Sequence, residues 1–367
     1  MNDQTAERPL HSRFAGLARK LPHLPLATLP TPVREVAGPV GGATCKLDGA
    51  TARAYGGNKV RKLEYLLGQA RSHACTQVAT FGAAGSNHAT ATAVHAAAQG
   101  LRCVNFLSRQ RATKWVAGNL RRQIAAGAKI VYVDGDRAQR ERQARDFLNG
   151  SAHKTWRIPM GGSSDAGTIG YVNAGMELAR QIEQGDCRLP DRIYVPLGTM
   201  GTAVGIAIGL ACAGLRVPLH AVRVVHETVG SRALAPRLFE RTVRLLHALD
   251  ASFPRIVFDP AVFVVREEFF GNGYAHATKD AVAAVSYAHT HWSLELETTY
   301  SGKALAALLA DAVRDQRAPR HALFWSTYSA TPAPSSGTGD LRDKLPEPLR
   351  HYLAPTAPAI SAHPPRG

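Results

Sequence analysis

A lysine follows two glycines and an asparagine in the stretch GGNKVRKLEYLL, residues 56–67. Apolar residues recur at helical spacing after it, so the stretch predicts an amphipathic helix with Arg61, Lys62 and Glu64 on its solvent face. Lys59 stands where the chain leaves a glycine-permitted conformation, and at such a place the backbone can approach a ligand closely. The alternative is a solvated lysine in a basic first turn.

A second junction between an expected strand and an expected helix reads TFGAAGSNHATATAVHAAAQG, residues 80–100. Serine and asparagine are common at the N-cap, and that role alone would account for Ser86 or Asn87. With His88 they present a hydroxyl, an amide and an imidazole beside the free N–H groups of a helix start, where an anion is stabilised. The triplet therefore indicates an anion-binding loop.

A third junction, YVPLGTMGTAVGIAIGLACAG (residues 194–214), runs from an apolar strand through Thr199, Met200, Gly201 and Thr202 into a helix of small residues. It is neither a Walker loop nor the dinucleotide fingerprint. Glycines allow the backbone to close around an oxyanion and threonine hydroxyls add donors, so the loop predicts a cup for a single phosphate. A tight turn with close helix packing is the alternative.

Short apolar runs alternate with longer helical patterns along most of the chain. The expected strands are residues 77–81, 102–107, 129–133, 192–196, 220–225, 262–265, 294–297 and 322–325. The expected helices after the one that begins near Lys59 are residues 89–99, 114–126, 168–182, 202–213, 232–246, 278–290 and 302–315. This alternation predicts an α/β fold with parallel sheets covered by helices on both faces. Such sheets bind ligands at the carboxyl ends of their strands.

Bulk properties narrow the class of protein. The 367 residues, 45% of them hydrophobic, are enough for two domains. Five widely spaced cysteines without a C-x-x-C pair suggest neither a disulfide framework nor a zinc site, and they predict a reducing, cytoplasmic setting. No signal-peptide pattern opens the chain and no apolar run reaches membrane length, so no membrane association is expected.

The formal net charge is +16, but the Lys and Arg residues are scattered and no nucleic-acid-binding motif accompanies them. We therefore expect a preference for anionic ligands and no specific nucleic-acid partner. From residue 331 onward the sequence is rich in Pro, Ser and Ala without a lasting period. At least the last ~15 residues are expected to be loosely held or disordered.

Taken together, the motifs resemble the pyridoxal-phosphate enzymes that include D-cysteine desulfhydrase and 1-aminocyclopropane-1-carboxylate deaminase, of the tryptophan-synthase-β-like fold (fold type II). The shared motifs are GGNKVRKLEYLL, GSNH, GGSSDAGTIGY, GTMGTAVG, NGYAHATKDA and YSGKALAAL. The resemblance implies two open twisted parallel-sheet domains with pyridoxal 5′-phosphate between them, in a homodimer. The large domain would comprise residues 1–57 and 158–330 and the small domain residues 58–157, with a Pro-rich extension at residues 331–367.

By this resemblance Lys59 forms the imine with the cofactor, and a partly desolvated position near Arg61 and Lys62 would favour that role by lowering its pKa. Asn87 would hydrogen-bond the 3′ oxygen of the cofactor. The phosphate would be held by Thr199, Met200, Gly201 and Thr202. The substrate would be bound by Ser86, Asn87, His88, Gly162 and Ser163.

Tyr274 and Tyr300 match two active-site tyrosines of the family, and aromatic core filling is the alternative. With Lys59 and Ser86 they complete the implied catalytic set. Thr327 aligns with the threonine of the family's Thr-Gly-Gly motif and would face the pyridine nitrogen of the cofactor. Here both glycines are replaced, since the motif reads Thr-Tyr-Ser, so the chain departs from the family along this backbone path.

The resemblance implies α,β-elimination from a small amino acid such as D-cysteine, giving a 2-oxo acid and ammonia. Cyclopropane deaminases typically carry Glu after the second tyrosine and Gln after Ser-Asn, whereas this chain has Ser301 and His88. The alternatives are deamination of the cyclopropane amino acid, a cysteate sulfo-lyase on the same scaffold, and a non-catalytic protein that binds pyridoxal phosphate.

Overall fold

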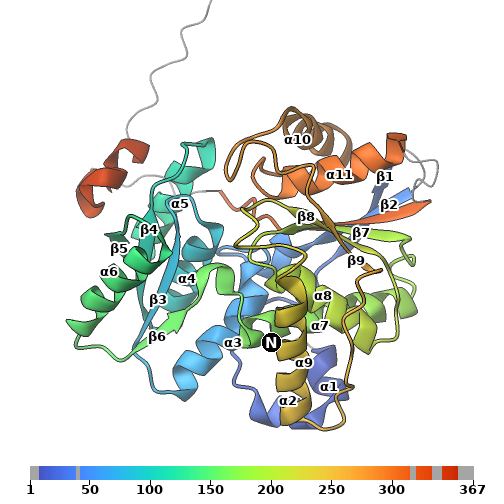
Figure 1. Ribbon diagram of the computed structural model, residues 1–367, viewed down its shortest axis with the longest axis horizontal. Coiled ribbons are helices and arrows are strands. Elements are labelled where there is room, and N and C mark those ends of the chain that lie inside the picture. The colour runs from blue at the N-terminus through green and yellow to red at the C-terminus, as the bar shows by residue number, and fades with distance from the viewer. Residues whose placement is uncertain (1–7, 39–41, 315–319, 333–340, 354–367) are drawn as a thin grey trace, which may run out of the picture.

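The computed structural model describes residues 8–38, 42–314, 320–332 and 341–353, and its strands form two sheets (Figure 1). The larger sheet has the strand order β1 (Val33–Ala37), β2 (Gly42–Leu47), β10 (His321–Ser326), β7 (Arg192–Leu197), β8 (Leu219–Arg223) and β9 (Phe263–Arg266). The smaller sheet has the order β5 (Lys129–Tyr132), β4 (Arg102–Ser108), β3 (Gln77–Ala83) and β6 (Thr155–Ile158). All neighbouring strands are parallel except the antiparallel pair β1 and β2. The predicted α/β class with two parallel-sheet units is confirmed.

Helices cover both faces of each sheet (Figure 1). In chain order they are α1 (Pro9–Arg13), α2 (Ala15–Lys20), α3 (Lys59–Ser72), α4 (Asn87–Ala98), α5 (Lys114–Ala125), α6 (Arg137–Asn149), α7 (Asp165–Glu183), α8 (Gly201–Cys212), α9 (Ala235–Leu249), α10 (Lys279–Trp292) and α11 (Ser301–Arg314). Each predicted helix is present within a few residues of its expected bounds. No helix in the described part of the chain is both long and apolar enough to cross a membrane.

The larger sheet is buried on both faces because successive side chains of a strand point to opposite sides. On β10, Leu323 and Trp325 join the apolar cluster that includes α7, α8 and α9. Ala322 and Phe324 of the same strand join the cluster with α10 and α11. This burial on both faces explains why the central strands have apolar sequences.

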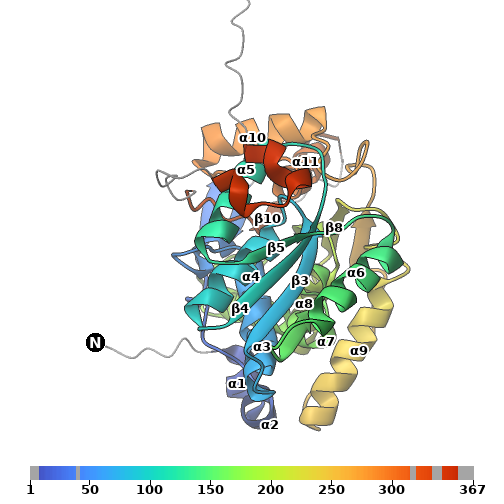
Figure 2. The same cartoon turned by 90° about the vertical axis from the view of Figure 1, so that its left-hand side faces the viewer.

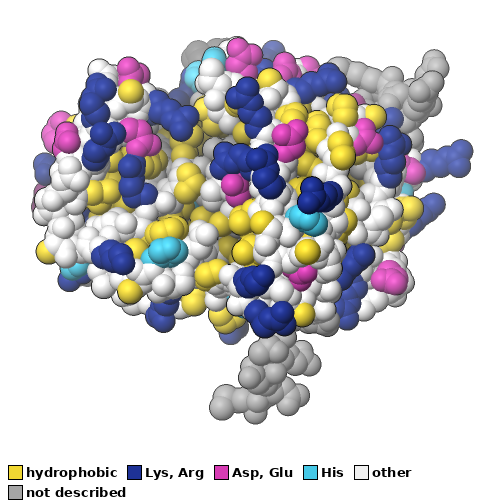
Figure 3. All heavy atoms as spheres, turned by 60° about the horizontal axis from the view of Figure 1, so that its bottom comes forward, with side chains coloured by type: hydrophobic (Ala, Val, Ile, Leu, Met, Phe, Trp, Pro, Cys, Tyr) yellow, Lys and Arg dark blue, Asp and Glu magenta, His cyan; other side chains and the backbone are white. Residues whose placement is uncertain are grey.

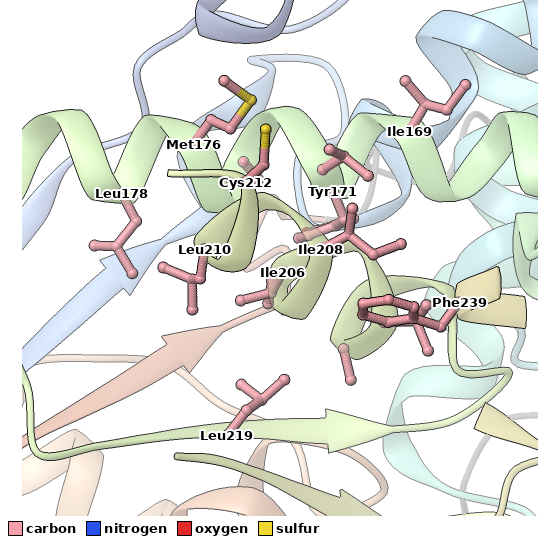
Figure 4. Close-up of a cluster of buried hydrophobic side chains, with 14 of the residues drawn as sticks. Ile169, Tyr171, Met176, Leu178, Ile206, Ile208, Leu210, Cys212, Leu219 and Phe239 are labelled. Carbon is pink, nitrogen blue, oxygen red and sulfur yellow. The ribbon is translucent and has the colours of Figure 1, made fainter. Parts of the chain in front are cut away.

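Helices α7 and α8 pack closely against each other in the apolar cluster on one face of the larger sheet (Figure 4). A Cβ at Gly209 would lie 2.2 Å from the carbonyl oxygen of Val172, and one at Gly205 would lie 2.4 Å from the Cβ of Tyr171. The small residues of α8 therefore let the two helices approach at backbone distance. Close helix packing, the alternative explanation for the third junction, is thus one part of what its glycines do.

The prediction that Arg61, Lys62 and Glu64 face solvent is wrong, because all three side chains are at most 2% exposed. Helix α3 is covered on several sides, with α4 and α7 among its neighbours. The Arg61 guanidinium contacts Asp48 at 3.1 Å and Glu177 at 2.9 Å. Arg61 is buried together with these two carboxylates, and Glu64 is buried in an ion pair with Arg8.

The expected strand at residues 294–297 is also wrong, since this segment is a loop. The buried carboxylate of Glu297 accepts hydrogen bonds from the backbone N–H groups of Thr299, Tyr300 and Ser301 at 2.7–2.8 Å. These bonds turn the chain into α11 instead of continuing an extended strand. Strands β1, β2 and β6 were not expected from the sequence.

Part of the C-terminal extension packs on the smaller sheet's helices (Figure 2). Residues 341–353 form two 3-10 helices, and Leu345 and Leu349 are buried in a cluster with Leu120 of α5. The last ~15 residues, which were expected to be loosely held or disordered, fall almost entirely in residues 354–367, and these lie outside the described residues, as do residues 333–340.

Lys and Arg side chains are dispersed over the face shown in Figure 3, with Asp and Glu among them. The positive charge on this face is therefore not gathered into one continuous strip.

Candidate functional site

Hydrogen bonds connect the starts of three helices, α3, α4 and α8, in the region between the two sheets. Asn58, at the N-cap of α3, donates from Nδ2 to Thr202 Oγ1 at the start of α8 over 3.0 Å. Tyr55, just before α3, donates its hydroxyl to Asn87 Oδ1 at the start of α4 over 3.0 Å. The loops singled out in the sequence therefore meet in one site, although they are up to 144 residues apart.

Lys59 is the first residue of α3. It follows Gly57, whose φ of +91° lies in the region that favours glycine and where a Cβ would approach the carbonyl oxygen of Thr327 to 2.9 Å. That same oxygen accepts the backbone N–H of Asn58 at 3.1 Å. Burial lowers the pKa of Lys59 from 10.5 to about 8. The expected glycine-permitted turn before a desolvated lysine is present.

Gly201 lies among donor groups at the start of α8. A Cβ at this position would lie 2.7 Å from Ser163 Oγ, 3.0 Å from Lys62 Nζ and 3.1 Å from Thr168 Oγ1. Thr199 adds a fourth group, with its Oγ1 2.7 Å from Ser163 Oγ. Hydroxyl groups and an ammonium group thus surround a point that only a glycine leaves open, and this donor set suits a phosphate.

Met200 and Thr202 flank this cup. Met200 has a φ of +69°, which is uncommon for a residue with a side chain, and it supplies no side-chain cap to α8. The Gly201 N–H at the start of α8 donates to Ser163 Oγ at 3.2 Å, so the N–H groups of the following residues are the ones that can donate to an external acceptor. The Thr202 hydroxyl accepts from Asn58 and can donate its own proton onward.

Lys62 is a functional candidate that the sequence analysis assigned to solvent. Its Nζ donates to Ser163 Oγ at 3.0 Å and to the carbonyl oxygen of Gly161 at 3.2 Å. Burial, and secondly the nearby Lys59, lower its pKa well below 10.5. The only signal for this residue was its spacing, three positions and thus about one helical turn after Lys59.

The orientation of the Asn87 amide follows from its neighbours. Arg122 donates to Asn119 Oδ1 at 3.2 Å, and Asn119 donates from Nδ2 to Asn87 Oδ1 at 2.9 Å. Because Tyr55 also donates to Asn87 Oδ1, the Nδ2 group of Asn87 remains as a donor for a ligand. The sequence analysis did not identify Tyr55 or Asn119 as site residues. The only signal for Asn119 was a polar residue on the apolar side of an amphipathic helix, where the structure buries it.

Ser86 and His88 occupy different environments. Ser86 is the N-cap of α4, and its Oγ accepts the N–H of Ala89 at 3.2 Å. His88 is buried with Nε2 2.9 Å from Thr80 Oγ1. Burial first, and then Lys59 and Lys62, lower the pKa of His88 well below 6.5, so its ring is neutral at pH 7.

Gly162 lies beside His88. Its φ is +65°, and a Cβ there would approach His88 Cε1 to 3.2 Å and Lys62 Cδ to 3.5 Å. Gly162 therefore keeps room for the lysine that reaches the cup. Ser163, the next residue, belongs to the cup itself.

Tyr274 and Tyr300 form a pair at the other side of the site. Their hydroxyl groups are 3.0 Å apart and their rings meet edge to face at 5.8 Å. Tyr300 also approaches the cup loop, because a Cβ on Gly198 would lie 3.3 Å from its ring. Burial first, and then Tyr274, raise the pKa of Tyr300 well above 10, so its hydroxyl keeps its proton at neutral pH.

The segment Thr327 to Ser329 runs along the turn before α3 despite the two replaced glycines. Thr327 binds Asn58 through its carbonyl oxygen, and Ser329 Oγ accepts the N–H of Gly56 at 3.1 Å. Tyr328 lines the same small pocket as Asn87. The Ser329 side chain thus ties this segment to the turn before α3.

The sequence matches the family model described as pyridoxal-phosphate dependent enzyme over residues 24–324. It is 33% identical to nocardicin C-9′ epimerase of Nocardia uniformis subsp. tsuyamanensis over 91% of this chain and 99% of that protein. It is 31% identical to D-cysteine desulfhydrase of Klebsiella pneumoniae subsp. pneumoniae over 74% of this chain and 81% of that protein. A crystal structure of an ACC deaminase homologue superposes with a TM-score of 0.74 at 26% identity, covering 95% of this chain and all of that one. The chain therefore belongs to the pyridoxal-phosphate-dependent enzymes, in the group that includes D-cysteine desulfhydrase and 1-aminocyclopropane-1-carboxylate deaminase.

Proposed function

We propose that this enzyme removes the α-proton of an amino acid and expels a β-substituent from it, with Lys59 as the base. The observation that carries the proposal is the pair of lysines at the start of α3, with Lys59 partly buried at the helix terminus and Lys62 buried in the cup. No carboxylate contributes to the lowered pKa of either lysine. Two lysine amino groups without a carboxylate partner among the described residues suit an anionic cofactor.

The residues of the site fit pyridoxal phosphate. Lys62, Ser163, Thr199, Gly201 and Thr202 supply donors for a phosphate. In the same proposal, Asn87 Nδ2 would donate to the 3′ oxygen, Met200 would contribute backbone, and Thr327 would lie near the pyridine nitrogen. When bound, the cofactor supplies the electron sink that makes an α-proton removable.

Lys59 suits the role of base because of its pKa. With a pKa of about 8, about a tenth of the lysine is unprotonated at pH 7, against a negligible fraction for an ordinary lysine. The protonated hydroxyls of Tyr274 and Tyr300 can supply a proton to a leaving group. They are held in place by their mutual hydrogen bond.

We assign the substrate carboxylate to Ser86 and to the backbone N–H groups at the start of α4. Neutral His88, already bonded to Thr80, supports this loop and is a weak partner for an anion. The structure also leads us to assign Ser163 to the phosphate instead of the substrate.

Epimerisation at the α-carbon is a second candidate. The 33% identity to nocardicin C-9′ epimerase extends over 99% of that protein, which favours it. The same proton removal leads to elimination when the substrate has a β leaving group, and to inversion when it has none and a proton is returned to the other face. Lys59 and the tyrosine pair offer two proton-transfer groups for that outcome.

Deamination of the cyclopropane amino acid is disfavoured by Ser301. Its Oγ accepts the N–H of Glu297 at 3.1 Å, and its own N–H donates to the Glu297 carboxylate at 2.8 Å. A hydroxyl used in this helix start does not replace a carboxylate in acid–base chemistry.

The experiment is an assay of the holoenzyme with D- and L-cysteine, β-chloroalanine, serine, cysteate and the cyclopropane amino acid. Ammonia and 2-oxo acid report elimination, while exchange of the α-proton in deuterated water reports removal of that proton alone. Exchange and elimination are both expected, with the cyclopropane amino acid inert. Exchange with inversion but without ammonia release would indicate epimerisation instead of elimination. The absence of exchange with every substrate would refute the proposal.

We further propose a homodimer in a reducing cytoplasm, with the domain boundaries expected from the sequence. The five cysteines support a reducing setting, because all are buried and unpaired. Light scattering during gel filtration tests the dimer.

A further inference from the structure

A hollow of about 540 Å³ adjoins the site between the loop 111–115, which leads into α5, and the segment 271–279, which leads into α10. Thr113 and Trp115 line both this hollow and the small pocket that contains Asn87 and Tyr300. The two spaces are therefore neighbours with a common wall. A ligand held by its amino-acid end in the site can extend its other end into the hollow.

The walls of the hollow are basic. Arg111, Lys114, His276 and Lys279 line it, and none of its lining residues is Asp or Glu. Arg111 Nη1 of one wall lies 3.4 Å from His276 Nδ1 of the other, so side chains from the two walls meet here.

Glu297 and Asp280 are carboxylates on the adjoining elements, and neither lines the hollow. Glu297 lines the small pocket but is buried, and its oxygens accept three backbone N–H groups. Asp280 follows Lys279 in the first turn of α10 but is not among the residues that line the hollow. The Thr113 side chain does not cap α5, so the start of that helix adds to the positive potential.

We propose that the substrate is an amino acid with an extended side chain that ends in an anionic group, and that this group binds in the hollow. The inference rests on the proposed function, because the α-carbon must lie near Lys59. Ligand pockets typically enclose about 300–1,000 Å³, so the hollow is a full binding volume in addition to the space that cysteine needs. A distal carboxylate, sulfonate or phosphate is the group that Lys114 and Lys279 would recognise.

Trp115 and Tyr328 stand where the small pocket meets the hollow. Both line the small pocket, and Trp115 lines the hollow as well. Lys114 lies over the Trp115 ring at 5.0 Å, which links the aromatic wall to the basic one. The geometry therefore provides apolar contact for the middle of a side chain and positive charge for its end.

Two ligands that differ only in distal charge test the inference. They are the α-methyl derivatives of S-(2-carboxyethyl)cysteine and S-(2-carbamoylethyl)cysteine, which lack an α-proton and so cannot undergo proton removal. Titration calorimetry of the holoenzyme should show the carboxylate compound binding about tenfold or more tightly, a ratio expected from one charge-assisted contact.

The double variant Lys114→Gln, Lys279→Gln should bring that ratio close to one. Lys154→Gln, which removes an exposed lysine away from the hollow, should leave the ratio unchanged. Equal affinity for the two compounds in the wild type, or an undiminished ratio in the double variant, would overturn the inference.

Failure of the proposed function has a different signature. Charge selectivity in binding without elimination from any amino acid would support the inference and remove only the proposed reaction. Elimination from cysteine without charge selectivity would remove only the inference.

Discussion

Two groups of charged residues pack around α3, and they differ in composition. Around Arg61, the carboxylates of Asp48 and Glu177 accept from the guanidinium, and Lys46 adds a 2.5 Å contact to Glu177. Around Lys59, the buried groups are Lys62 and His88, and within the described part of the chain no carboxylate takes part in their hydrogen bonds.

The pKa shifts follow this difference. Burial alone would raise the pKa of Glu177, but Arg61 and Lys46 lower it to about 2, so the pair stays ionised. Burial lowers the pKa of Lys59 to about 8 and moves that of Lys62 well below 10.5. In the first group the positive charges are balanced by carboxylates of the protein, and the group stabilises the fold. In the second group the positive charge is balanced only when an anion binds, and a cofactor phosphate would provide that anion.

The largest expected effect is on the first group. Glu177→Gln should lower the free energy of unfolding by about 3–5 kcal/mol, because Arg61 and Lys46 would be left buried without their shared carboxylate. Urea unfolding measures this change. Arg216→Gln, which breaks an exposed ion pair with Asp259, is the matched control and should cost no more than about 1 kcal/mol. Equal losses in the two variants would contradict the distinction.

A change in the second group should act in the opposite direction on the apoprotein. Lys62→Met removes a buried cation that has no carboxylate partner, so the apoprotein should be as stable as the wild type or more stable. The variant should lose about 1.5–3 kcal/mol of affinity for pyridoxal phosphate, because a charge-assisted contact is lost. Absorbance titration of the apoprotein with cofactor measures the affinity, and a strongly destabilised apoprotein would refute this interpretation of Lys62.

The smallest expected effect is a pH dependence. The folded pKa of Lys59, about 8, lies below its ordinary value of 10.5, so the folded apoprotein binds fewer protons than the unfolded chain between these values. Stability from this group is therefore present above pH 10.5 and is lost as the pH falls through 8. Lys59→Met should be more stable than the wild type below pH 8, by about 1 kcal/mol after allowance for solvent screening.

That advantage of Lys59→Met should disappear as the pH rises through the window. Urea unfolding of both apoproteins below, within and above the window measures the difference. A stability difference that stays constant with pH would mean that Lys59 is not desolvated in the fold.

Sequence reasoning predicted the turn before Lys59 and the order of the helices better than it predicted the burial around them. The glycine-permitted turn before Lys59 was predicted because two consecutive glycines precede the helix, a local signal visible in the sequence, and Gly57 does have a positive φ. The parallel sheets were found because the strands and helices alternate. Both signals depend on residues that are close together in the chain.

Arg61 and Lys62 were misplaced because helical periodicity identifies the apolar face of α3 but does not show that its polar face is also covered. The partners that allow this burial lie far away in the sequence, such as Glu177, 116 residues from Arg61. Tyr55 and Asn119 were missed for the same reason, since 64 residues separate them. The prediction of a strand at residues 294–297 was wrong because the Glu297 carboxylate accepts backbone N–H groups of the next turn. Strand propensity does not account for such a side-chain contact.

The central claim is that Lys59 is the lysine that reacts with the cofactor and that Lys62 beside it holds the phosphate. Borohydride reduction of the holoenzyme, followed by peptide mapping, tests this most directly. The account predicts that the cofactor is fixed to Lys59 in the peptide that contains GGNKVRK, with Lys62 unmodified. Label on Lys62, or on any lysine outside this peptide, would contradict it.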